Sequence, residues 1–125
     1  MTSDWIPSTP ALSVETIVAT MQHHRCVAVH FWATWNGYDR DFDTRLAPLR
    51  IEFADRVEFR SVNVDDDELA GVQISVPVLN VPALGIWRHG VRDQVVVGMR
   101  DRDALRRALA WAVRPAGVPP SEATS

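Results

Sequence analysis

The chain of 125 residues is long enough for one domain with a buried core that needs no disulfide. Apolar residues make up 46% and charged residues 23%, the balance of an ordinary soluble globular protein. The net charge of -3 argues against nucleic acid or an acidic membrane as a partner. No apolar stretch is long enough to span a bilayer, and the N-terminus lacks the features of a signal peptide, so we expect a cytoplasmic protein.

The first third of the chain predicts a helix followed by a buried strand. Residues 1–12 are rich in turn formers and offer at most one short edge strand. Ser13 is a candidate N-cap for a helix whose apolar stripe is Val14, Ile17, Val18 and Met21. Residues 26–33 are almost all apolar and predict a buried strand.

The next segment predicts a long helix and a half-buried strand. Asn36 is a candidate N-cap, and Asp39 stands three residues later, where a carboxylate can reach back to the backbone N–H of the cap. Apolar residues at helical spacing extend this helix over about 37–55. Residues 57–64 alternate between apolar and polar, which is typical of a half-buried strand, and the acidic run 65–68 ends it.

The last third predicts a β-hairpin and a closing helix. Residues 81–87 form a strand that opens on a proline, His89-Gly90 marks a turn, and 91–97 are the hairpin partner. The last helix begins at Asp101 or Asp103. The element order predicts a three-layer α/β sandwich with a mixed sheet. We expect an N-terminal segment over 1–12, one domain over 13–114 and a disordered tail over 115–125.

One segment after the first predicted strand carries a resemblance to a known family. It reads Phe31-Trp32-Ala33-Thr34-Trp35-Asn36-Gly37-Tyr38-Asp39. It is similar to the thioredoxin active site, F-W-A-x-W-C-G-P-C, in the same strand–loop–helix setting. Asn36 and Asp39 occupy the two cysteine positions, and Tyr38 occupies that of the proline between them. The resemblance therefore implies a thioredoxin-like fold without the two sulfurs that perform its chemistry.

The resemblance extends over residues 13–113. Val81-Pro82 looks like the family's Ile-Pro, whose cis peptide faces the active-site loop, and Gly98 matches the glycine beside the substrate groove. The family's buried Asp and nearby Lys, which assist proton transfer, correspond to His30 and Ser61 here. Nucleophile, resolving thiol and proton-transfer support are thus replaced together, as expected of a site released from redox duty.

The candidate polar residues each have a structural and a functional interpretation. Asn36 and Asp39 either start the helix or form a polar recognition loop with Asp39 as an acceptor. His30 is either a hydrogen-bonded core residue or half of a proton-handling pair with Asp39, although no nucleophile is identifiable beside it. The acidic run 65–68 lacks the spacing of a calcium loop, so we expect no metal site and no cofactor.

The substrate groove is the feature that the resemblance leaves intact. Its predicted lining is Trp35, Tyr38, Val81, Pro82, Val97, Gly98 and Met99, whereas Gly37 belongs only to the former active-site loop. Two interpretations stay open: the groove binds a peptide by β-strand addition, or Trp35 and Pro82 are retained for folding alone. We hypothesise a redox-inactive protein with no catalytic residues, monomeric or weakly dimeric, that binds a peptide or protein partner. The alternative is an oxidoreductase that acts through Cys26 or a partner thiol.

Overall fold

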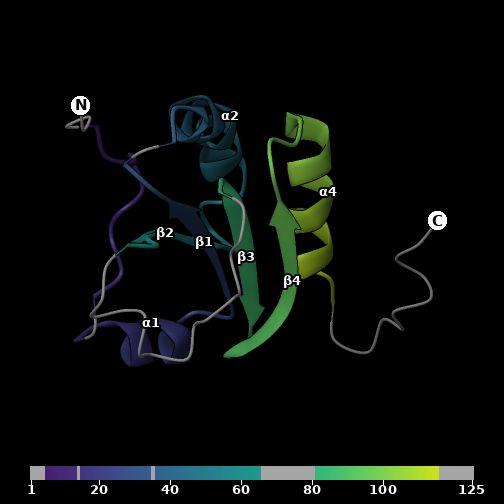
Figure 1. Cartoon of the computed structure of the whole chain (residues 1–125). Coiled ribbons are helices and arrows are strands. Elements are labelled where there is room, and N and C mark those ends of the chain that lie inside the picture. The colour runs from purple at the N-terminus through teal and green to yellow at the C-terminus, as the bar shows by residue number, and fades with distance from the viewer. Residues whose placement is uncertain (1–4, 14, 35, 66–80, 116–125) are drawn as a thin grey trace.

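The computed structural model of the protein describes residues 5–13, 15–34, 36–65 and 81–115 (Figure 1). Within these ranges the strands form one sheet in the order β2-β1-β3-β4. β1 pairs with β2 in parallel and with β3 antiparallel, and β4 runs antiparallel to β3. The predicted mixed sheet is therefore confirmed. The strands are β1 (Cys26–Trp32), β2 (Glu58–Asn63), β3 (Ala83–Arg88) and β4 (Val91–Val97).

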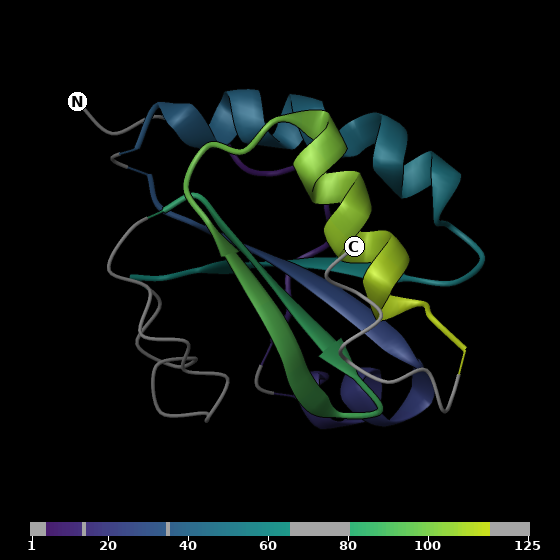
Figure 2. The ribbon, with the colours of Figure 1, turned by 90° about the vertical axis from the view of Figure 1, so that its right-hand side faces the viewer.

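Helices cover both faces of this sheet. Figure 2 shows α2 and α4 on one face and α1 on the other, which gives the predicted three layers. The three helices are α1 (Ile17–His23), α2 (Tyr38–Glu52) and α4 (Arg102–Ala112). None of the helices in the described ranges has the length and apolar character needed to cross a membrane.

Alternation along β1 decides which side chains meet which helix. Successive residues of a strand point to opposite faces. Cys26 and Ala28 belong to the apolar cluster that contains the buried residues of α2 and α4, whereas Val27 and Val29 pack with α1. His30 follows the first set, and its ring lies 4.8 Å from that of Phe42 on α2. The strand thus directs a histidine toward the helix that begins at the loop.

The predicted start of α1 is wrong. The helix begins at Ile17, with Thr16 rather than Ser13 at the N-cap. Ser13 still makes the predicted capping contact, because its Oγ accepts the N–H of Thr16 at 3.2 Å while Oγ1 of Thr16 accepts the N–H of Ser13 at 3.2 Å. Val18 is 61% exposed and is not part of the core. Val14 lies outside the described residues.

The other element boundaries agree more closely with the sequence. α2 ends at Glu52, three residues earlier than predicted, and the edge expected in the N-terminal segment is a single parallel bridge between Ala11 and Ser61. Asp101 caps α4, since its Oδ1 accepts the N–H of Ala104 at 2.8 Å. The part of the acidic run after Asp65 and residues 116–125 of the predicted tail lie outside the described residues.

Candidate functional site

The loop between β1 and α2 is fastened at its centre by Asn36. The Oδ1 atom of Asn36 accepts the N–H of Tyr38 at 2.9 Å, which is the capping contact that the sequence predicts, although the helix bounds place Gly37 at the N-cap. The Nδ2 atom donates to the backbone oxygen of Val81. The peptide bond that follows, between Val81 and Pro82, is cis. One amide therefore links the start of α2 to the segment that precedes β3.

Asp39 contacts His30, as one of the two interpretations of the sequence has it, and does not reach back to the helix cap. Its carboxylate is fully buried, with Oδ1 2.9 Å from Nε2 of His30 and with Oδ2 accepting the N–H of Ala33 at 3.0 Å. The predicted contact with the N–H of Asn36 is absent, because that N–H donates to the oxygen of Ala33 at 3.2 Å. Asp39 therefore turns inward, toward the strand, rather than lying on the surface of the first helical turn.

His30 completes a buried polar pair. It has no exposed surface, and its Nδ1 finds no hydrogen-bond partner among the described residues. The bond joins Nε2 of His30 to Oδ1 of Asp39, and the tautomer of the ring decides which atom donates. Ser61 stands opposite His30 on β2, but its hydroxyl donates to the oxygen of Thr9 at 3.1 Å. The pair can hold a proton away from water, and no hydroxyl or thiol of the described residues hydrogen-bonds to it.

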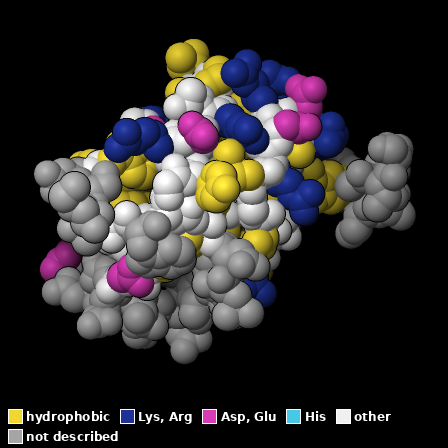
Figure 3. Space-filling view, turned by 45° about the horizontal axis from the view of Figure 1, so that its top comes forward, with side chains coloured by type: hydrophobic (Ala, Val, Ile, Leu, Met, Phe, Trp, Pro, Cys, Tyr) yellow, Lys and Arg dark blue, Asp and Glu magenta, His cyan; other side chains and the backbone are white. Residues whose placement is uncertain are grey.

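Two of the residues predicted to line the groove, Val81 and Gly98, lie next to Pro82. The N–H of Gly98 donates to the oxygen of Pro82 at 2.8 Å, while Val81 is held by Asn36. Tyr38 is 65% exposed and Val97 is 41% exposed, so both side chains present apolar surface to solvent. Figure 3 shows hydrophobic side chains near the centre of the face turned to the viewer, with basic and acidic side chains around them. Met99 is half-buried, and Trp35 lies outside the described residues.

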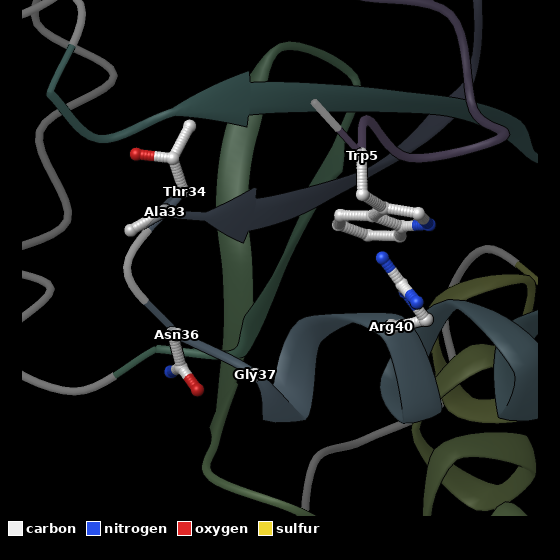
Figure 4. Close-up of a pocket in the computed structure, with 6 residues that line it drawn as sticks. All are labelled: Trp5, Ala33, Thr34, Asn36, Gly37 and Arg40. Atoms are coloured by element: carbon white, nitrogen blue, oxygen red, sulfur yellow. The ribbon is translucent and has the colours of Figure 1, made fainter. Parts of the chain in front are cut away.

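A small pocket lies against the loop beside the N-terminal segment. Its volume is about 240 Å³. Figure 4 shows Trp5 and Arg40 facing each other in it, with the guanidinium 6.0 Å from the ring centroid. Trp5 also packs edge-on against Trp32, at 5.8 Å between ring centroids. The lining residues are Trp5, Ala33, Thr34, Asn36, Gly37 and Arg40.

The sequence analysis missed Trp5 and Arg40. A large aromatic side chain in an otherwise turn-rich segment is the one signal that pointed to Trp5, because such a residue needs an apolar surface to pack on. No sequence signal brings Arg40 to it, since their contact depends on how the N-terminal segment folds back.

Cys26 lies at the opposite end of β1 from the loop. The residue is 1% exposed, and its thiol donates to the oxygen of Ala112 at 3.1 Å. Burial raises the pKa of the thiol above its ordinary value of 9.0. Reactive thiols need the opposite shift and an open approach. No group of three or more metal-ligating side chains occurs in the described part of the chain.

Known proteins share both the sequence and the fold. Residues 10–111 match the family model described as Thioredoxin. The chain belongs to the thioredoxin family. It is 27% identical to a thioredoxin of Alicyclobacillus acidocaldarius over 107 residues, which are 82% of this chain and 96% of that protein. It is 28% identical to a thioredoxin of Mycolicibacterium smegmatis over 87 residues, covering 70% of this chain and 78% of the relative.

Solved structures agree with the family assignment at the level of the fold. Mitochondrial thioredoxin 3 of Saccharomyces cerevisiae superposes with a TM-score of 0.71 at 20% identity, over 82% of this chain and 94% of that one. A variant thioredoxin from Halobacterium salinarum gives a TM-score of 0.70 at 19% identity, over 94% of this chain and all of its own. The thioredoxin fold predicted from the sequence is therefore confirmed.

Proposed function

We propose that this thioredoxin-family protein does not catalyse thiol–disulfide exchange and binds a peptide or protein partner through the groove around Pro82. The observation that supports this most directly is the use of the two cysteine positions. Asn36 hydrogen-bonds the loop to the backbone oxygen of Val81, and Asp39 is buried and hydrogen-bonded to His30. Exchange needs a thiolate that attacks a disulfide sulfur, and neither an amide nor a carboxylate can form the mixed disulfide.

The alternative through Cys26 is disfavoured by the position of its thiol. Cys26 is the only cysteine of the chain, it is buried, and burial raises its pKa. A substrate disulfide would have to reach the far end of β1 and displace the contact with Ala112. We therefore expect no disulfide reduction by the purified protein and no effect of Cys26→Ser on that result.

The groove supports a binding role because apolar side chains there face solvent. Tyr38 and Val97 are exposed on either side of the Val81–Pro82 segment. Extended peptides can pair with exposed backbone beside such a surface, and tyrosine is a frequent anchor of binding interfaces. The role would be that of a scaffold, a chaperone-like protein or a regulator. A cytoplasmic location and a monomer or weak dimer stay predictions.

The test is binding to a partner captured from extract and then purified. We expect Trp35→Ala and Val81→Asp each to weaken binding at least about tenfold, the loss of one good anchor. Val18→Asp is the matched control, because Val18 is 61% exposed on α1, on the other face of the sheet. Circular dichroism checks that each variant is folded. Unchanged affinity in both groove variants would refute the proposal. It would mean that these residues are retained for folding and not for binding.

A further inference from the structure

Two arginines stand at one end of the groove, on different elements. Arg45 belongs to α2, and its Nη1 donates to the backbone oxygen of Arg100 at 2.9 Å. Arg100 lies between β4 and α4, and its Nε donates to the oxygen of Val97 at 3.2 Å. The two guanidinium groups are therefore both held at the segment 97–100, with Arg45 half-buried and Arg100 exposed.

The charges of these two arginines are not neutralised within the described part of the chain. No carboxylate there lies within 4.0 Å of either guanidinium. Three acidic residues close to them in sequence have other partners, since Asp101 caps α4, Asp103 pairs with Arg106 at 3.0 Å and Asp43 accepts the hydroxyl of Ser8 at 2.9 Å. Two positive charges thus persist at one place on a chain whose net charge is -3.

The arginines are continuous with the proposed binding surface. Arg100 is bonded to Val97, and Gly98 is bonded to Pro82. Tyr38 and Arg45 are seven residues apart on α2 and share a face, about 10 Å from each other along the axis. About three residues of an extended peptide cover that distance.

We propose that the groove selects acidic peptides: an extended segment lies beside Pro82 and places an Asp or Glu carboxylate on Arg45 and Arg100. This inference rests on the proposed function and adds the class of partner. Guanidinium groups match a carboxylate through paired N–H donors, and the bond is stronger than one between neutral groups. The net negative charge of the chain disfavours a long polyanion such as a nucleic acid, because the rest of the surface would repel it.

The experiment compares two fluorescein-labelled octapeptides, one of alternating valine and glutamate and one of alternating valine and glutamine. Fluorescence polarisation with the full chain measures both at low salt. We expect the glutamate peptide to bind about tenfold more tightly, and we expect the difference to shrink in 0.5 M NaCl, as screening requires. In Arg45→Gln/Arg100→Gln the two peptides should bind equally. Arg25→Gln is the single-charge control, since Arg25 is exposed at the far end of β1.

Each outcome decides a different part. Equal affinities for the two peptides in the unaltered chain would overturn the preference for acidic peptides and leave a neutral groove. The inference would also be overturned if the double arginine variant still bound the glutamate peptide more tightly than the glutamine peptide. The same holds if Tyr38→Ala did not weaken that preference, because the acidic peptide would then bind elsewhere. Absence of binding by both peptides would overturn the inference as stated, while the purified partner and Trp35→Ala would still decide the proposed function.

Discussion

At the scale of single residues, the most consequential substitution is the carboxylate at position 39. A cysteine there needs only to approach its partner thiol, but Asp39 has two oxygens that must both be satisfied in the interior. The strand supplies His30 for one oxygen, and the loop supplies the N–H of Ala33 for the other. The change at position 39 and the histidine on β1 therefore form one unit of structure.

We expect Asp39→Ala to lower the free energy of unfolding by about 2–4 kcal/mol, because it leaves Nε2 of His30 and the N–H of Ala33 buried without a hydrogen-bond partner. Urea denaturation at neutral pH measures the loss. Asp41→Ala is the matched control on the same turn of α2, where the carboxylate is exposed and its removal should cost less than about 1 kcal/mol. Equal losses in the two variants would show that the buried pair stabilises nothing.

The thiol of Cys26 gives a second prediction, on pH. Its pKa is raised above 9.0 in the folded chain, so folding keeps the proton that the unfolded chain releases near that value. The resulting stability is fully present below pH 9 and is lost as the pH rises from there through the folded pKa. We expect the stability of the unaltered chain relative to Cys26→Ser to be constant at pH 7–8 and to fall from pH 9 to 10. A constant difference over the whole range would contradict this.

At the scale of the elements, the sequence predicted what periodicity can encode. The alternation in residues 57–64 and the turn at His89-Gly90 gave β2 and the hairpin β3–β4, and the spacing of Phe42, Leu46 and Leu49 gave α2. The capping bonds predicted at Ser13 are present, but the regular helix α1 begins only at Ile17, later than predicted. The sequence offered the contact of Asp39 with His30 as one of two interpretations, and local pattern alone could not choose between them because His30 comes from β1.

One strand allows no added side-chain atom at its centre. A Cβ on Gly85 of β3 would lie 2.7 Å from the ring of Trp87 and 2.9 Å from that of Phe31, and both rings are buried. We expect Gly85→Ala to cost about 1–3 kcal/mol in thermal or urea unfolding, the usual cost of overpacking. Gly37→Ala is the control, because a Cβ there meets nothing within 4 Å and the backbone is already helical. If Gly37→Ala destabilised the protein and Gly85→Ala did not, the claim that β3 has no room for a Cβ at Gly85 would be wrong.

At the scale of the whole molecule, the described residues keep the thioredoxin fold, while Asn36 and Asp39 occupy the two cysteine positions. The loop still precedes the N-terminus of α2, and the helix dipole there favours a thiolate. We expect Asn36→Cys/Asp39→Cys to gain measurable reduction of insulin disulfides, with Asn36→Ser/Asp39→Ser as the inactive control. A folded double-cysteine variant without activity would mean that His30 and Ser61, at the positions of the family's proton-transfer residues, matter more than the scaffold.

The bond between Asn36 and Val81 determines what a single cysteine substitution in this loop would do. Asn36→Cys alone would remove the hydrogen bond that joins the loop to Val81, and the variant would still lack a resolving thiol at position 39. Asp39→Cys alone would leave the buried His30 without the carboxylate to which it hydrogen-bonds. Each single substitution is therefore expected to lower stability without supplying a pair of thiols, so the two positions are coupled through the contacts that they make separately.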